Sequence, residues 1–280
     1  MDQIHRKSAE LSVLSQSLWS QKYYEVLLAE LPFQSLISKD YEGEISGFLG
    51  DSVRISSFPE FDEANILAED ERNDASAVTV TQQTLNINYR VAKDFIITNL
   101  AMLQSLPSMD KLRDLAIYSI NKKIQSLIIS LTIPSASAPD HQISYDSGST
   151  LALSDLLEVK ELLDAQDVPM SDRHMIVGAA QLNDLFLVNG FVSTDFGVSN
   201  APLLNGGLPS QMVGFMPHFT SLVGNTSYYF HNSFMTMATQ QGLNVKEFDG
   251  GVNGDRNYRI NIDTVLGIKQ LDNTRVVTLS

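Results

Sequence analysis

The sequence contains no cysteine among its 280 residues. The chain therefore has no disulfide, no zinc–thiolate site and no thiol nucleophile, which fits a reducing compartment. Basic residues are also scarce, because 19 Lys and Arg stand against 33 Asp and Glu and give a formal net charge of −14. Nucleic acids and anionic membranes are bound mainly through cationic side chains, so this balance argues against tight binding of either.

Long hydrophobic runs are absent as well. The N-terminal stretch MDQIHRKSAE has no apolar core, and no run approaches the roughly 18 apolar residues that a membrane span needs. Hydrophobic residues still make up 43% of the chain, which is enough to form a sizeable core in one large domain or two modest ones. We therefore expect a globular chain that does not enter a membrane.

The motifs of common enzyme sites are missing. There is no G-x-x-x-x-G-K-[ST], no G-x-G-x-x-G after a strand and no G-x-S-x-G. The stretch from Asp249 resembles a calcium loop, but Gly251 and Ile260 stand where that loop needs ligands. Five histidines stand apart in sequence, without metal-ligand spacing: His5, His141, His174, His218 and His231. We expect no catalytic residue, no cofactor and no metal site.

Residues 108–131 carry the strongest helical pattern. Apolar side chains recur there three and four positions apart: Met109, Leu112, Leu115, Ala116, Ile120, Ile124, Leu127, Ile128 and Leu131. Pro107 and Ser108 favour a helix start and Pro134 favours its end. The opposite face is basic, and it is either solvated or a docking surface for something acidic: Lys111, Arg113, Lys122 and Lys123.

Two alternating segments flank an acidic stretch. GDSVRISSF from Gly50 and AVTVTQQTLNINYRVAKDF from Ala77 show the period of two that is typical of strands. The residues between them are rich in carboxylates: Glu60, Asp62, Glu63, Glu69, Asp70, Glu71 and Asp74. This pattern predicts a long hairpin with an acidic tip. A two-stranded ribbon is marginal alone, so we expect it to rest on another surface.

The rest of the chain mixes helical and strand patterns, which predicts an α+β fold. Residues 1–45 are moderately amphipathic and carry an aromatic cluster that covers either its own core or a neighbouring subunit: Trp19, Tyr23 and Tyr24. Residues 134–150 read as a loop, and residues 151–165 as a second amphipathic helix. RHMIVGA predicts a buried strand, AAQLNDLFLV a short helix, and residues 244–280 three strand-like runs.

The order of these parts resembles the major capsid proteins of tailed bacteriophages, which have the HK-ninety-seven-type fold. KDYEGEISGFLGDSVRI is similar to the lead-in to the family's extended loop, and the acidic hairpin is similar to that loop. VKELLDAQDVPMSDRHMIVGAAQLNDLF carries the nearest likeness, with a helix, an L-D-x-x-x-V-P turn, Arg173, a strand and another helix. APLLNGGLPSQMVGFMPHFTSLV and the closing RINIDTVLGIKQLDNTRVVTLS also resemble family segments. The likeness spans nearly the whole chain.

The resemblance implies a division of the chain into an N-terminal arm, an extended loop, a peripheral domain with a long spine helix, and an axial domain. The expected boundaries are an arm at 1–47, a peripheral strand at 48–57, the extended loop at 58–82, the peripheral domain at 83–135 with its spine helix at 108–131, the axial domain at 136–245, and strands that return to the peripheral domain at 246–280.

The resemblance also implies a function. The chain is expected to be a structural virion protein, a coat protein that self-assembles in the bacterial cytoplasm through pentamers and hexamers into an icosahedral procapsid and then a shell around double-stranded DNA. Its expected partners are itself, a scaffolding protein, a portal protein and a head-decoration protein. The lead-in begins within the first 45 residues, so we expect an uncleaved chain and a separately encoded scaffold. A different virion component, such as a tail or head-decoration protein, and a cytoplasmic enzyme with an unrecognised site remain as alternatives.

Contacts between subunits are expected at three places. The acidic tip is expected to lie over a neighbour's spine helix near Arg113, Lys122 and Lys123, and the aromatic cluster of the arm is expected to reach a neighbour. Some relatives join loop lysines to asparagines covalently. The chain has no lysine between Lys39 and Lys93, so we expect a shell that is held by non-covalent contacts alone.

Overall fold

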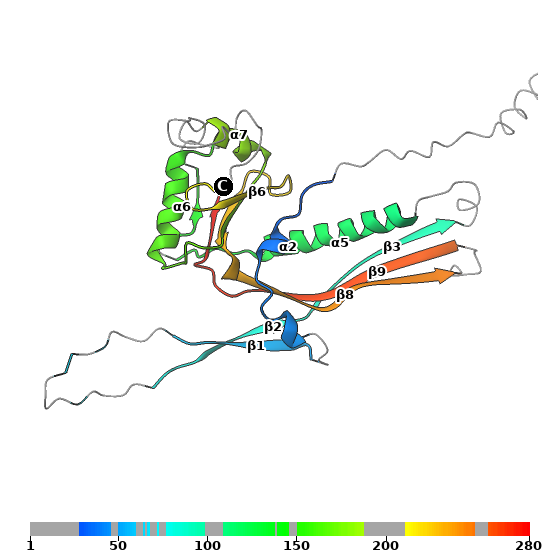
Figure 1. Cartoon of the computed structure of the whole chain (residues 1–280), viewed down its shortest axis with the longest axis horizontal. Helices are drawn as coiled ribbons and strands as arrows, with labels where there is room; N and C mark the ends of the chain where they lie inside the picture. The colour runs from blue at the N-terminus through cyan, green and yellow to red at the C-terminus, as the bar shows by residue number, and fades with distance from the viewer. Residues whose placement is uncertain are drawn as a thin grey trace, which may run out of the picture.

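The computed structural model of the chain describes residues 28–45, 50–59, 77–98, 109–137, 139–145, 150–187, 211–249 and 257–280, together with positions 64, 66, 67 and 72. The described strands form three sheets of two, three and five strands. Figure 1 shows them as two bodies and a projecting hairpin. We call the bodies the helix body, which contains the three-stranded sheet, and the five-stranded body.

The helix body is a long helix on a three-stranded sheet (Figure 1). Helix α5 runs from Met109 to Leu131, and the antiparallel sheet has the order β3-β9-β8. The strand bounds are Tyr89–Thr98 for β3, Asn257–Gln270 for β9 and Met235–Asp249 for β8. Strand β9 is long because the period-two pattern of residues 257–270 continues without a proline.

The core of the helix body comes from one stripe of α5. Ile120, Ile124 and Ile128 recur every four residues, and all three are buried in the same core as Ile260 and Ile262 of β9. Fully burying such a side chain stabilises the fold by about 1.5–3 kcal/mol. Of the other residues expected on this face, Ala116 is buried, whereas Leu115 is 39% exposed. The buried stripe is therefore narrower than the sequence pattern predicted.

The five-stranded body is a mixed sheet with the order β4-β10-β7-β5-β6, on which α6 and α7 pack. Its elements are β4 Gln142–Ile143, α6 Leu153–Ala165, β5 Arg173–Val177, α7 Ala179–Leu187, β6 Met216–Phe219, β7 Ser227–His231 and β10 Val276–Leu279. Strands β5 and β7 are buried along their whole length. Val159 and Leu163 of α6 share a core with Met175, Val177 and Tyr229 of the sheet.

The two bodies share one hydrophobic core. Phe230 of β7 packs on Phe234 of the short helix η2 (Asn232–Phe234), with ring centroids 4.7 Å apart, and on Phe33 at 5.8 Å. Phe33 belongs to α2 (Phe33–Leu36) and lies in the same buried cluster as Ile128 of α5. Because this contact is apolar and continuous, we expect the bodies to move as one unit.

The hairpin consists of β1 (Ser52–Ser57) and β2 (Thr81–Asn86), paired antiparallel from Ser52–Asn86 to Ser57–Thr81. This pairing confirms the predicted hairpin. A small separate core lies at its base, where Ile55 and Leu85 pack with Ala238 of β8 and with α3 (Glu42–Ile45). Figure 1 shows the hairpin leaving the bodies and projecting away from α5.

Three strands lie apart from the segments with which the expected boundaries group them, and the boundaries themselves stay predictions. Residues 276–279 were expected among the strands that return to the peripheral domain, but they form β10 between β4 and β7 of the five-stranded sheet. The turn before β10 is held by Asp272, which accepts hydrogen bonds from Thr274 and Arg275 and redirects the chain. Strand β1 was expected in the peripheral domain, and among the described strands it pairs with β2 alone. Strand β8, which was expected to return only after residue 245, enters the three-stranded sheet at Met235.

No helix within the described ranges is long and apolar enough to cross a membrane.

Candidate subunit interface

The described part of the hairpin exposes apolar side chains. Phe58 is 73% exposed and Ile66 is wholly exposed, and Leu67, Val78 and Val80 are also exposed. Each of these lies beyond the small core at the base of the hairpin. Apolar side chains on a projecting ribbon are not buried by the rest of their own chain and so do not stabilise its fold. The hairpin is therefore suited to burial against another surface.

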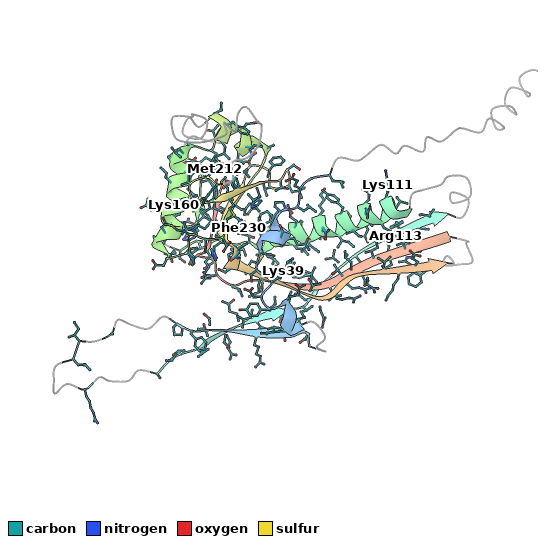
Figure 2. The ribbon with its side chains drawn as sticks, in the orientation of Figure 1. Lys39, Lys111, Arg113, Lys160, Met212 and Phe230 are labelled. Atoms are coloured by element: carbon teal, nitrogen blue, oxygen red, sulfur yellow. The ribbon has the colours of Figure 1, made fainter. Side chains whose placement is uncertain are left out.

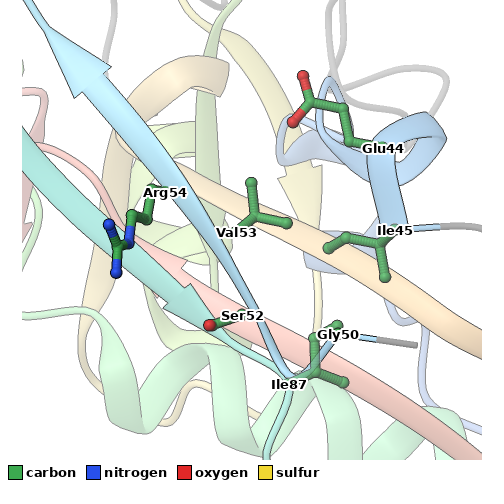
Figure 3. Close-up of a pocket in the computed structure, with 7 residues that line it drawn as sticks. All are labelled: Glu44, Ile45, Gly50, Ser52, Val53, Arg54 and Ile87. Atoms are coloured by element: carbon green, nitrogen blue, oxygen red, sulfur yellow. The ribbon is translucent and has the colours of Figure 1, made fainter. Parts of the chain in front are cut away.

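A hollow of about 440 Å³ lies on one side of the hairpin base, and Figure 3 shows the side chains around it. Ile45 of α3 and Val53 of β1 point toward each other across it, with Ile87 below. Glu44 and Arg54 add one charge of each sign. The walls are mainly apolar, which fits a packing surface better than a catalytic centre.

A second hollow of about 250 Å³ lies between the hairpin and the turn that precedes β10. It is more polar than the first, because Asp40, Asp272 and Arg275 line it together with several serines. These groups already bind one another, since Asp272 accepts from Arg275 and Asp40 accepts from Ser38. Within the part of the chain that the structure describes, no group of three or more His, Asp or Glu side chains could hold a metal ion.

The basic residues of α5 that were expected at an interface differ in their surroundings. Arg113 forms an ion pair with Glu247 of β8 in the same chain, and Figure 2 labels it at the end of α5 beside the sheet. Lys122 and Lys123 are exposed. The expected contact of Arg113 with a neighbour therefore competes with a partner inside its own subunit, whereas the two lysines lie open on the surface.

The other predicted contact residues lie outside the described residues. These are the acidic tip and the aromatic cluster of the arm: Glu60, Asp62, Glu63, Glu69, Asp70, Glu71, Asp74, Trp19, Tyr23 and Tyr24. Their contacts stay predictions.

The face of the three-stranded sheet opposite α5 carries paired charges that the sequence analysis did not single out. Arg90 donates to Asp263 through both Nε (3.0 Å) and Nη2 (2.6 Å). Asp94 accepts from Arg259 and Asn261, and the hydrogen bond from Arg259 is the main reason that its pKa lies below 3.8. The alternation in R-V-A-K-D and R-I-N-I-D was the signal that these charges share one face.

A buried arginine closes the turn between α6 and β5. Arg173 is 2% exposed, and it donates through Nη1 to Asp164 (2.7 Å), through Nη2 to the carbonyl of Val168 (2.5 Å) and through Nε to the carbonyl of Pro169 (2.9 Å). Hydrogen bonds from Lys160 and Arg173 hold the pKa of Asp164 below 3.8, with Lys160 the larger cause. Arg173 therefore has a structural role in the motif that carries the nearest family likeness.

Two histidines that stand far apart in sequence meet on adjacent strands, and a third lies on the next strand of the sheet. His218 Nε2 of β6 lies 3.3 Å from His174 Nδ1 of β5, and His231 of β7 contacts Ser233. Burial lowers the pKa of all three histidines, and for His174 the neighbouring His218 lowers it further. Sequence spacing carried no signal for this contact, because the parallel pairing of β5 and β6 brings His174 and His218 together.

No protein-family model and no curated protein sequence matches the chain. Solved structures match it over almost its full length. A structure from Mycobacterium phage Che8 has a TM-score of 0.77 and 20% identity, and the match covers 94% of this chain and 96% of that one. The capsid structure of the cyanophage P-SCSP1u has a TM-score of 0.75 and 10% identity, covering 96% and 93%. The cyanophage Pam1 capsid asymmetric unit has a TM-score of 0.74 and 12% identity, covering 96% of both chains.

The chain has the phage capsid fold. At these identities the likeness concerns the fold, and it confirms the fold class that the order of motifs predicted. The phage capsid fold includes both bodies and the hairpin of this chain, because the match leaves only 4–6% of it uncovered.

Proposed function

We propose that the chain is a major capsid protein that assembles through pentamers and hexamers into an icosahedral shell around double-stranded DNA. The observation that carries the proposal is the end-to-end match to phage capsid structures, which cover 96% of the chain. Its place is then the virion, and its role is structural rather than catalytic. A formal net charge of −14 supports this, because a shell protein must not bind its genome tightly.

The exposed hairpin supports assembly through contacts that are not self-complementary. A ribbon on one subunit that covers a different surface on the next makes a heterologous contact, and such contacts close into rings when the rotation between subunits allows it. Obligate interfaces of this kind bury about 2,000 Å² or more. Many modest contacts in one shell then act together by multivalency.

The family's domains map onto the fold in the following way. We assign the helix body to the peripheral domain with α5 as its spine helix, the five-stranded body to the axial domain, the hairpin to the extended loop, and the residues before Phe33 to the arm. A scaffolding protein, a portal protein and a head-decoration protein are the proposed partners besides other copies of the chain.

The main test is microscopy of the full chain, expressed with and without its neighbouring genes. Closed shells in negative stain are the expected result, and the isolated chain is expected to form pentamers, hexamers, tubes or aberrant particles as its concentration rises. Open tubes alone, or trimers that coat another particle, would favour a different virion component. A monomer at millimolar concentration, with or without a scaffold, would refute the proposal.

The acidic tip of the hairpin is proposed to dock over Lys122 and Lys123 of a neighbouring spine helix. Exposed ion pairs contribute only about 0–1 kcal/mol each, so single substitutions should have mild effects. Reversing Lys122 and Lys123 to Glu together should impair assembly, and more strongly at low salt, where screening is weak.

A charge swap gives the control for this contact. Combining the Lys122→Glu and Lys123→Glu changes with Glu69→Lys and Asp70→Lys on the tip should restore assembly, because the two surfaces are then complementary again. Normal assembly of the doubly reversed helix at low salt would show that the basic face is merely solvated. Impaired assembly without rescue by the swap would show that another surface meets the lysines.

A further inference from the structure

The hairpin touches the body backbone to backbone at one glycine of β9. A Cβ atom added at Gly267 would lie 2.6 Å from the carbonyl oxygen of Asn86, 3.2 Å from its carbonyl carbon and 3.3 Å from Cα of Ile87. All three atoms belong to the main chain, so no side-chain rotation can relieve the contact. Residues 86 and 87 are the end of β2 and the first position after it.

The glycine is not explained by its own backbone conformation. Gly267 is not among the residues with positive φ, and it lies inside a regular ladder, paired with Ala238 of β8. A glycine in the interior of a strand destabilises it by roughly 0.5–1 kcal/mol relative to alanine. Close approach of another backbone is the usual reason for one, and here that backbone is the hairpin.

Further contacts at the hairpin base restrain its direction. Gln83 of β2 donates to the carbonyl of Leu271 at 2.8 Å, and Gln240 of β8 donates to the carbonyl of Gly50 at 2.9 Å. Ala238, the register partner of Gly267, is fully buried beneath the hairpin in the small core that contains Leu85. The base of the hairpin thus packs on two small residues, Gly267 and Ala238, and the hydrogen bonds of Gln83 and Gln240 hold it there.

We propose that Gly267 is a positioning residue that sets the height and angle at which the hairpin leaves the body, and that this angle decides whether subunits can close a shell. The second half of this inference rests on the proposed function. It assigns a role in assembly to a residue that is buried inside one subunit, far along the chain from the hairpin that it holds.

The size of the expected displacement follows from the contact. Ordinary van der Waals contact begins at 3.4 Å, so a methyl group at Gly267 must lift Asn86 by about 0.8 Å, the difference between 3.4 and 2.6 Å. The Gln83 anchor lies three residues away, about 10 Å along the strand. A lift of this size over that lever tilts the strand by roughly 5°. A larger side chain should tilt it further or break the Gln83 anchor.

The lack of cysteine makes this displacement measurable. Cysteines placed at Thr84 on the exposed face of the hairpin and at Ser130 on α5 would be the only two in the chain, and spin labels on them report the distance between hairpin and body. Gly267→Ala and Gly267→Val should shift or broaden this distance distribution, with the larger effect for valine. Both should lose closed shells, while near-ultraviolet circular dichroism of the bodies stays unchanged.

Two further variants complete the test. Gly242→Ala in β8 is the matched control, because an added Cβ meets nothing within 4 Å there, and it should leave the label distances and the shells unchanged. Gln83→Ala adds no atom where Gly267 meets the backbone of Asn86, and it removes the hydrogen bond to the carbonyl of Leu271. It should therefore broaden the distribution of label distances even if the valine variant does not fold.

The possible outcomes separate the two proposals. Unchanged label distances in Gly267→Val, or a changed angle with normal shells, would overturn the role of Gly267. If the unaltered chain never forms shells, the proposed function fails, and the label distances still show whether Gly267 positions the hairpin.

Discussion

Replacing Arg173 with methionine tests whether the turn between α6 and β5 depends on one buried guanidinium. Methionine has a similar length and no donor, so the substitution removes the ion pair with Asp164 and the hydrogen bonds to Val168 and Pro169. The Asp164 side chain is 31% exposed and keeps its ion pair with Lys160 at 2.5 Å, so its charge is still compensated. The carbonyl of Val168 loses its donor in a buried place, whereas that of Pro169, an exposed residue, can accept from water instead.

The cost follows mainly from the buried carbonyl of Val168. Leaving a buried acceptor unsatisfied costs about 1–3 kcal/mol. Removal of the buried charge offsets part of the lost ion pair, because its desolvation penalty is also removed. We therefore expect Arg173→Met to lower the free energy of unfolding by about 1–3 kcal/mol. Against a typical total of about 5–15 kcal/mol, this would reduce the folded fraction strongly near body temperature.

Urea unfolding of the isolated chain, followed by circular dichroism, measures the change, and hydrogen exchange of β5 locates it. Lys160→Met is the matched control, because it removes the other cation that contacts Asp164 at a site that is about one third exposed. Such a pair contributes about 0–1 kcal/mol. Arg173→Lys should recover only part of the loss, because one ammonium cannot span all three acceptors. An Arg173→Met variant within about 0.5 kcal/mol of the control would refute this reasoning.

Two other predictions concern protons and covalent bonds. Burial lowers the pKa of His174 and of His218 below 6.5, so as the pH falls the unfolded chain binds these protons before the folded chain does. The free energy of unfolding should therefore be highest above about pH 6.5 and decrease below it. The decrease is at most about 1.4 kcal/mol per pH unit for each histidine. Urea titrations should show a shallower fall for His218→Gln, and an equal fall in both proteins would contradict the assignment. Because there is no lysine between Lys39 and Lys93, particles boiled in detergent should give one band near 31.0 kDa. A ladder of covalent pentamers and hexamers would show that an amine outside the hairpin had been recruited.

The sequence by itself determined the elements whose signals are local. The expected helix at 108–131 and the observed helix α5 differ by one residue, because a 3.6-residue period and a proline beyond its end require no information from distant parts of the chain. Strand β5 and helix α7 were predicted for the same reason. The hairpin was found because alternation on both sides of an acidic stretch predicts the pairing of β1 with β2.

Only part of the candidate interface could be predicted in this way. Exposure of Lys122 and Lys123 follows from their position opposite the apolar stripe of α5. The partner of Arg113 does not, because Glu247 lies 134 residues further along and reaches it only through the packing of β8 under the helix. Residues 276–279 were expected beside the strands before them because adjacent strands in a sequence often pair, whereas the turn at Asp272 sends β10 to another sheet than β9.

The tertiary structure alone decided the contacts between distant segments. His174 and His218 meet because β5 and β6 run parallel, and Arg90 finds Asp263 because β3 pairs with β9 across 173 residues of sequence. Gly267 has an ordinary strand conformation, and only the backbone of the hairpin lying against it explains why no side chain fits there. Periodicity specifies which face of an element is apolar, but which elements meet depends on chain topology, and no local pattern in this sequence encodes it.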